Sequence, residues 1–186
     1  VNHIILIPGT VNECFEFGWK ALDIAEELQT PVIVLSDLEL GMNIWAADKL
    51  EYPDVSMKRG KTLWENDLAQ FAKKHNREWG RYLDVDGDGI TYRTLPGNMN
   101  EKAAYFTRGT SHDDFAHYSE KPEDWEKNLL RLRKKFEKAK LLVPNPEIQG
   151  RNLEDAIISY GSTDMAISET IDNLKSKEIN IDYLRI

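Results

Sequence analysis

Three aspartates at alternate positions are the residues of this chain whose types and spacing most resemble a metal site. Residues 84–89 read Asp-Val-Asp-Gly-Asp-Gly, the first half of an EF-hand loop, in which positions 1, 3 and 5 supply oxygen ligands and position 6 is Gly. Position 12 of such a loop is a bidentate Glu, but here it is Leu95. We therefore expect no metal site, and a calcium-binding or partner-binding module using Asp84, Asp86 and Asp88 is the alternative.

A second polar segment, residues 105–114, reads Tyr-Phe-Thr-Arg-Gly-Thr-Ser-His-Asp-Asp. The forked guanidinium of Arg108 could hold a carboxylate or a phosphate, and His112 could transfer a proton near neutral pH. The adjacent Ser-His-Asp at 111–113 is no catalytic triad, because triad residues meet through the fold and not through adjacency. The alternative for the whole segment is a polar turn stabilised by its own side-chain hydrogen bonds.

Two strand–glycine–helix junctions, at Gly9-Thr10 and Gly161-Ser162, resemble phosphate-binding turns. Each lacks the repeated glycines of a nucleotide-binding motif, so ordinary helix capping is the favoured interpretation.

Composition excludes several classes of protein. The 186 residues are 41% hydrophobic and 30% charged, as in a folded globular protein, and the net charge of −8 argues against nucleic-acid binding. The densest basic segment, 131–140, has apolar residues at helical spacing and is interpreted as a solvated helix face.

Cys14 is the only cysteine, so the chain cannot build a disulfide, a cysteine zinc site or an iron–sulfur site, which is typical of a reducing cytoplasm. We also expect no membrane span and no signal peptide.

The N-terminal third predicts a parallel β-α-β unit. The apolar run Ile4–Ile7 is typical of a strand buried on both faces. Thr10 and Glu13 have the spacing of a capping box, which predicts a helix that continues to Leu28, and residues 32–35 form a second apolar strand.

The remainder predicts an irregular region followed by a second α/β unit. Helices are expected at 62–79 and 122–142, with long irregular segments around them. After a Pro-containing linker, a strand at 156–160, a helix at 163–175 and a strand at 179–186 are expected. Apolar runs at both ends of the chain lead us to expect part of a longer subunit.

Three segments in this order identify a family. Residues 31–43, 84–97 and 105–112 resemble the α subunit of 2-oxoacid:ferredoxin oxidoreductases, and most closely the 2-oxoglutarate type. The resemblance runs from about residue 4 to residue 186.

The resemblance implies an α/β fold in three parts. Residues 1–142 would be the later part of a thiamine diphosphate pyrimidine-binding domain with a long insertion. Residues 143–150 would be a linker, and residues 151–186 would begin a transketolase-C-like domain.

The resemblance also implies the chemistry and the partners. The family decarboxylates a 2-oxoacid oxidatively to an acyl-CoA, using thiamine diphosphate with magnesium, coenzyme A and an iron–sulfur cluster that reduces ferredoxin. A β subunit carries the pyrophosphate site and the cluster, while the thiamine-activating Glu and the substrate-carboxylate loop would precede residue 1. We therefore expect this segment alone to be inactive and to bind no cofactor. No catalytic residue is expected in it, and Arg108, His112, Arg93 and Asp84 are the residues expected near substrate or coenzyme A.

Overall fold

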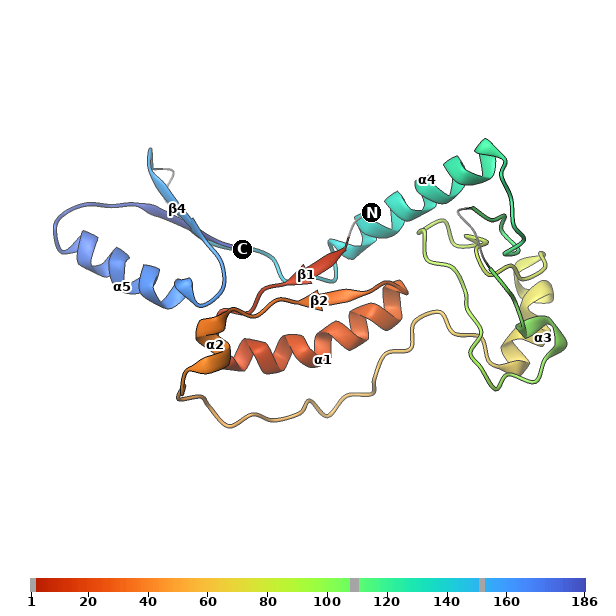
Figure 1. Ribbon diagram of the computed structural model, residues 1–186, viewed down its shortest axis with the longest axis horizontal. Coiled ribbons are helices and arrows are strands. Elements are labelled where there is room, and N and C mark those ends of the chain that lie inside the picture. The colour runs from red at the N-terminus through yellow and green to blue at the C-terminus, as the bar shows by residue number, and fades with distance from the viewer. Residues whose placement is uncertain (1–2, 108–110, 151–152) are drawn as a thin grey trace. The chain divides into compact units, whose positions relative to one another are not determined.

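The computed structural model describes residues 3–107, 111–150 and 153–186 (Figure 1). It has the expected mixed α/β character, with one two-stranded and one three-stranded sheet in the described part of the chain. The chain forms two compact units. The first unit comprises Val1–Ala25, Thr30–Met57 and Val143–Ile186, and the second unit comprises Glu26–Gln29 and Lys58–Leu142.

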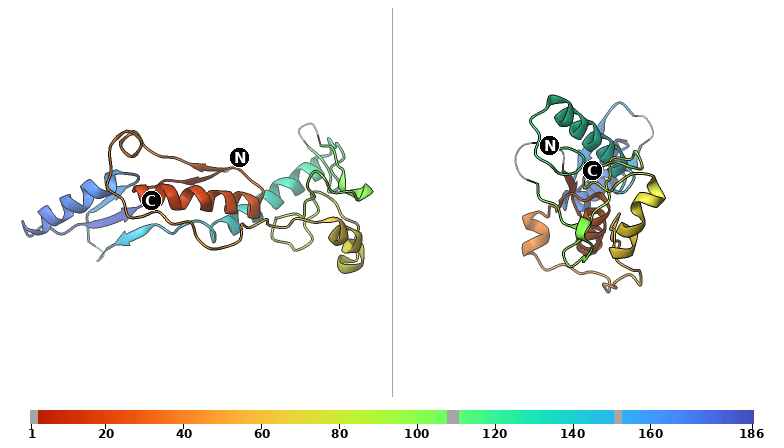
Figure 2. Two further views of the ribbon diagram at one scale, coloured as in Figure 1. Left: turned by 90° about the horizontal axis from the view of Figure 1, so that it is seen from below. Right: turned by 90° about the vertical axis from the view of Figure 1, so that its right-hand side faces the viewer.

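The β-α-β prediction at the N-terminus is confirmed. Strand β1 (Ile4–Leu6) pairs in parallel with β2 (Val32–Val34), and helix α1 (Val11–Leu28) connects them and lies alongside them in Figures 1 and 2. Ile4 and Leu6 are buried, whereas Ile5 between them is 52% exposed. Within this chain the apolar strand is therefore covered on one face only, and not on both as predicted.

The C-terminal part of the first unit contains the predicted strand–helix–strand. Strand β4 (Ala156–Ser159), helix α5 (Thr163–Lys175) and strand β5 (Asp182–Arg185) follow one another, and β4 and β5 pair in parallel. A strand that the sequence did not predict, β3 (Glu147–Gln149), lies inside the predicted linker and pairs antiparallel with β5, giving the order β3-β5-β4. The assignment of residues 1–142 and 151–186 to two domains stays a prediction.

Another unpredicted element of the first unit is the short helix α2 (Leu38–Met42). Asp37 caps it, because the Asp37 side chain accepts a hydrogen bond from the Leu40 amide at 2.9 Å.

The second unit contains two longer helices and a 3-10 turn. These are α3 (Glu65–His75), η1 (Glu101–Ala103) and α4 (Pro122–Ala139), and α4 begins with Pro122 at the predicted residue. Helix α3 is shorter than the predicted 62–79. The Trp64 amide donates to the Asp67 carboxylate at its start, and Asn76 ends it in the left-handed conformation.

The irregular part of the second unit is held by a small core and by side-chain bonds to the backbone. The core is Leu63, Leu68, Phe71 and Ala103, against which Trp79, Val85 and Tyr92 pack. Hydrogen bonds from Thr94 Oγ1 to the Ala103 carbonyl (2.7 Å) and from Trp79 Nε1 to the Tyr92 carbonyl (3.2 Å) satisfy backbone groups that no regular element pairs. No described helix combines the length and the apolar character that a membrane crossing needs.

Candidate functional site

The aspartate loop of the second unit surrounds a lysine. Lys61 Nζ lies 2.6 Å from Asp86 Oδ2, 2.8 Å from Asp88 Oδ1 and 2.9 Å from the Ile90 carbonyl oxygen. Burial alone lowers the pKa of Lys61, but the hydrogen bonds to Asp86 and Asp88 outweigh it and raise that pKa, so the ammonium stays charged. Lys61 thus occupies the position that a cation would take in an EF-hand loop.

The remaining aspartate of the loop has a structural role. The two carboxylate oxygens of Asp84 accept hydrogen bonds from the amides of Gly87 (2.9 Å) and Gly89 (3.0 Å). Both glycines have positive φ, which lets the loop fold back onto Asp84. Across the described part of the chain, no group of three or more His, Cys, Asp or Glu side chains is placed to hold a metal. These contacts do not support the calcium-binding alternative.

Replacing Lys61 with Met should test this interpretation. The side chains of Lys61, Asp86 and Asp88 are 20%, 36% and 28% exposed, so we expect a loss of about 1–2 kcal/mol in the free energy of unfolding. The freed carboxylates should also make the variant, but not the natural chain, more stable in millimolar calcium, as measured by thermal unfolding.

Lys49→Met is the matched control, because Lys49 forms an ion pair with Glu51 whose side chains are 85% and 70% exposed. It should change the free energy of unfolding by less than about 0.5 kcal/mol and create no calcium response. Equal calcium stabilisation of the natural chain and of Lys61→Met would contradict the prediction.

A second cluster of the same unit surrounds the ring of Tyr82. The His112 ring stacks on it with centroids 3.6 Å apart and an interplanar angle of 23°. The guanidinium carbons of Arg81 and Arg131 lie 5.0 Å and 5.6 Å from the Tyr82 centroid, at cation–π distance. The cluster thus joins an imidazole and two cations around one aromatic side chain.

Two described residues of the polar segment 105–114 contact this cluster. The Tyr105 hydroxyl accepts a hydrogen bond from Arg81 Nε at 3.3 Å, and His112 provides the stacking described above. Arg108 lies outside the described residues. The structure therefore brings Tyr105 and His112 to Arg81 and Tyr82, which no sequence motif had indicated.

The turn around His112 is partly the self-bonded turn that the sequence allowed as an alternative. Asp113 Oδ1 accepts hydrogen bonds from the amides of Phe115 (2.8 Å) and His117 (2.9 Å), and Asp113 Oδ2 contacts His117 Nδ1 at 3.1 Å. Burial raises the pKa of Asp113, but these hydrogen bonds outweigh it and lower the pKa. Since the Asp113 carboxylate contacts His117, and His112 Nδ1 lies 3.0 Å from the Asp113 carbonyl oxygen instead of its carboxylate, residues 111–113 do not form a triad.

Arg93 also has a partner within the second unit. Its guanidinium forms an ion pair with Glu26, and the Arg93 side chain is only 17% exposed. The backbone of Arg93 is also bonded within this unit, because the Arg93 amide donates a hydrogen bond to the Lys61 carbonyl at 2.9 Å. A structural role therefore accounts for Arg93 without a ligand.

Carboxylates of the chain itself occupy the two glycine junctions of the first unit. The Gly9 amide donates to Glu13 Oε2 at 2.7 Å, and the Glu13 amide donates to Thr10 Oγ1 at 3.1 Å. The Ser162 amide donates to Asp37 Oδ2 at 2.8 Å. These contacts agree with the capping interpretation.

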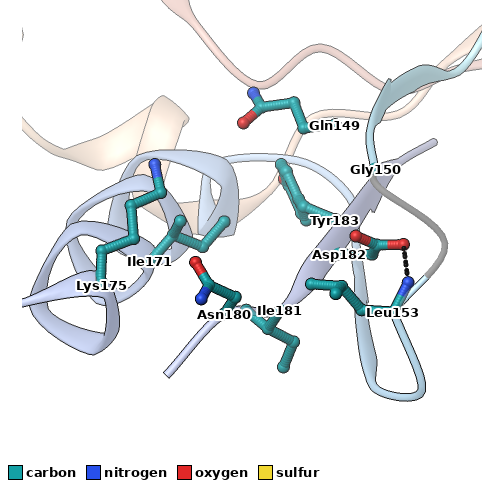
Figure 3. Close-up of a pocket in the computed structure, with 9 residues that line it drawn as sticks. All are labelled: Gln149, Gly150, Leu153, Ile171, Lys175, Asn180, Ile181, Asp182 and Tyr183. Atoms are coloured by element: carbon teal, nitrogen blue, oxygen red, sulfur yellow. Dashed lines mark hydrogen bonds between the residues drawn. The ribbon is translucent and has the colours of Figure 1, made fainter. Parts of the chain in front are cut away.

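A cavity of about 270 Å³ lies in the first unit beside helix α5 and the start of strand β5 (Figure 3). Its rim includes a hydrogen bond from the Leu153 amide to Asp182 Oδ2 (3.0 Å). Its lining is Gln149, Gly150, Leu153, Ile171, Lys175, Asn180, Ile181, Asp182 and Tyr183. Of the described residues predicted to lie near substrate, His112, Arg93 and Asp84, none is in this lining.

Curated proteins that are similar to this chain match it over nearly its whole length. No family model matches. The α subunit of 2-oxoacid:ferredoxin oxidoreductase 2 from Aeropyrum pernix is 29% identical over 98% of this chain and 27% of its own length. The 2-oxoglutarate synthase subunit KorA from Methanothermobacter marburgensis is 27% identical over 98% of this chain and 45% of its own length. This chain is similar to part of the 2-oxoacid:ferredoxin oxidoreductase α subunit.

A solved structure shows the same similarity. The 2-oxoglutarate:ferredoxin oxidoreductase from Magnetococcus marinus, with 2-oxoglutarate, coenzyme A and succinyl-CoA bound, matches 99% of this chain with a TM-score of 0.77 and 25% identity. The match covers 30% of that chain. The oxidoreductase resemblance inferred from the sequence is confirmed, and this chain spans less than half of the curated relatives described above.

Proposed function

We propose that this chain is part of the α subunit of a cytoplasmic, thiamine-dependent 2-oxoglutarate:ferredoxin oxidoreductase. Such an enzyme decarboxylates the 2-oxoacid oxidatively, forms an acyl-CoA and passes electrons to ferredoxin. The observation that carries the proposal is the match of 99% of the chain, at a TM-score of 0.77, to an enzyme with 2-oxoglutarate and coenzyme A bound. KorA, named for 2-oxoglutarate, supports the choice of substrate.

The donor set of this chain does not fit the redox and metal groups of such an enzyme. Cys14 is its only cysteine, and burial raises the pKa of the Cys14 thiol, which disfavours the thiolate that a cluster ligand must be. The described residues also offer no group of metal ligands for a magnesium diphosphate. We therefore propose that a β subunit holds the iron–sulfur cluster and the diphosphate of thiamine. Bound thiamine diphosphate supplies an electron sink for decarboxylation.

Activity of the assembled enzyme tests the proposal. The complete α-subunit gene and its partner gene would be expressed together, and ferredoxin reduction would be measured with 2-oxoglutarate or pyruvate in the presence of coenzyme A. We expect reduction that requires coenzyme A and prefers 2-oxoglutarate, and none from residues 1–186 alone. A complex loaded with cluster and thiamine that oxidises no 2-oxoacid would contradict the proposal.

We propose further that Arg108 and His112 lie near the anionic substrate or coenzyme A. The position of His112, stacked on Tyr82 beside Arg81, supports this, since it puts the His112 ring in a cationic, aromatic environment. The contacts of Arg93 and Asp84 with groups of their own unit favour a positioning role for these two residues.

Replacing Arg108 with Ala in the complete complex should raise KM for 2-oxoglutarate or for coenzyme A by about tenfold or more, because a charge-assisted hydrogen bond is lost. Arg133→Ala on the exposed face of helix α4 is the control and should leave both values unchanged. Unchanged kinetics in Arg108→Ala would remove Arg108 from the proposed site.

A further inference from the structure

Three basic side chains of the second unit gather without a carboxylate partner. Arg81, Arg131 and Lys135 form no ion pair within 4.0 Å in the described part of the chain, and residues 1–2, 108–110 and 151–152 contain no Asp or Glu. Lys135 is only 7% exposed, and Arg131 Nε is buried with no hydrogen-bond partner. The chain as a whole carries a charge of −8, so acidic residues are plentiful elsewhere.

A chain of hydrogen bonds holds these cations together. Arg81 donates from one terminal nitrogen to Thr91 Oγ1 (2.8 Å), Gln29 Nε2 donates to the Thr91 carbonyl (2.5 Å), and Lys135 Nζ donates to the Gln29 carbonyl (3.3 Å). Arg131 and Lys135 are four residues apart on α4 and therefore share a helix face. The two ends of the hydrogen-bond chain are thus both cations.

Gly89 allows the aspartate loop to pack directly on this part of α4. A Cβ at Gly89 would lie 2.4 Å from the Arg131 carbonyl oxygen and 2.4 Å from the Lys135 amide nitrogen, and Gly89 has φ of +80°. Arg131 then donates to the Gly89 carbonyl at 3.2 Å. Lys135 is buried and Arg131 Nε is buried beside this backbone contact, so their charge is not simply part of a solvated helix face.

The described residues compensate the charges of Arg131 and Lys135 poorly. Burial, Arg131 and Arg81 lower the pKa of Lys135 to about 8, and burial followed by Arg81 lowers the pKa of Arg131. Asp84 and Asp114 lie close enough to act on Arg131 in the opposite direction. Both have other partners, because Asp84 accepts the loop amides and Asp114 pairs with Lys127 at 2.5 Å.

We propose that Arg81, Arg131 and Lys135 bind a phosphate-type oxyanion, either free phosphate or the phosphate group of a larger ligand. Buried cations in proteins are normally paired, and neither the buried Lys135 nor the half-buried Arg81 and Arg131 is paired by the described chain. A guanidinium has five N–H donors and an ammonium has three, and the hydrogen bonds above use only part of this set. Two forked guanidinium groups and a lysine suit an oxyanion that carries two charges and several acceptor oxygens. This site does not depend on the proposed oxidoreductase activity.

Thermal unfolding of the native protein, with any partner subunits present, tests the site. Phosphate should raise the unfolding temperature relative to chloride at the same ionic strength, because a ligand that binds the folded state stabilises it. Arg131→Met and Lys135→Met should each weaken phosphate binding by about tenfold or more. The matched controls Arg133→Met and Lys138→Met, on exposed positions of the same helix, should bind phosphate as the natural protein does.

Competition distinguishes the two sources of the oxyanion. Coenzyme A acting at a concentration at least a hundredfold lower than inorganic phosphate would identify the phosphate of a larger ligand, and equal potency would identify the free ion. Three outcomes would overturn the proposal: no phosphate-specific stabilisation, equal weakening in the α4 variants and their controls, or a structure of the assembled protein with a partner carboxylate against these cations.

Discussion

Replacing Arg185 with Met should lower the free energy of unfolding by about 3 kcal/mol or more. Arg185, at the end of strand β5 in the first unit, forms an ion pair with Glu13 and lies 3.4 Å from Asp164. The three side chains are only 10%, 22% and 19% exposed. Removing the cation leaves two carboxylates of low exposure without their counter-ion, which costs more than the loss of a surface ion pair.

The Arg185 guanidinium is closely packed against the two glycine turns of the first unit. A Cβ at Gly9 would lie 2.8 Å from Arg185 and 2.9 Å from the Gly161 carbonyl oxygen, so the two glycine turns and the guanidinium are in close contact. Burial lowers the pKa of Arg185, but Glu13, Asp164 and Glu147 together outweigh it and raise the pKa. The guanidinium thus links residues from both ends of the sequence within the first unit.

Urea denaturation of Arg185→Met and of two controls checks this prediction. Glu147→Gln should cost less than about 1 kcal/mol, because the Glu147 side chain is 64% exposed and lies 3.5 Å from Arg185. Arg185→Lys should fall between the two, since an ammonium keeps the charge but not the fork. A cost for Arg185→Met no larger than that for Glu147→Gln would show that the ion pair contributes nothing.

Lys135→Met should have the opposite effect and stabilise the protein in phosphate-free buffer near pH 7 by about 1–3 kcal/mol. Lys135 is 7% exposed and lies in the field of Arg131 and Arg81, so its charge is unfavourable in the folded state. Methionine has similar length and no charge, and replacing a poorly compensated buried charge by an apolar side chain is commonly neutral or stabilising.

The effect of Lys135→Met should depend on pH in a defined direction. The folded-state pKa of Lys135 is about 8, against an ordinary value of 10.5, so the unfolded state binds more protons between these values. Below pH 8 the lysine is charged in both states and its unfavourable contribution is complete, about 3 kcal/mol on this shift. From pH 8 to about 10 the natural protein should gain stability relative to the variant.

Denaturation of both proteins at pH 7, 8, 9 and 10 measures this difference. Lys138→Met, at an exposed position of the same helix, is the control and should show no such trend. An excess stability of Lys135→Met that stays constant over this range would mean that Lys135 titrates normally in the folded protein.

Much of the secondary structure followed from local patterns. Thr10 and Glu13 begin helix α1 through short-range hydrogen bonds, and Pro122 begins α4 with its fixed φ. The segments that form β4, α5 and β5 have patterns of apolar residues that predict a strand, a helix and a strand. Such features depend on residues only a few positions apart, so they can be predicted from the sequence alone. Strand β3 was missed because three exposed residues carry no alternating pattern, and only pairing with β5 makes them a strand.

The candidate sites depended on contacts between residues far apart in the chain. The aspartate loop was recognisable as an imperfect calcium loop, but only the fold brought Lys61 into it from 25 and 27 positions earlier. The basic run of α4 was predicted as a solvated face, and packing of Gly89 against that helix buried Lys135 instead.

The sequence by itself therefore determined the resemblance to oxidoreductase α subunits, the principal helices and, through its single cysteine, the absence of a cysteine-built cluster in this chain. The tertiary structure decided which charges are paired, as for Arg185 with Glu13, 172 residues away, and which are left without a partner, as for Arg81, Arg131 and Lys135. The periodicity of apolar residues in a segment indicates which of its side chains face solvent and which are buried. It carries no information about charged residues that a distant segment brings close when the chain folds.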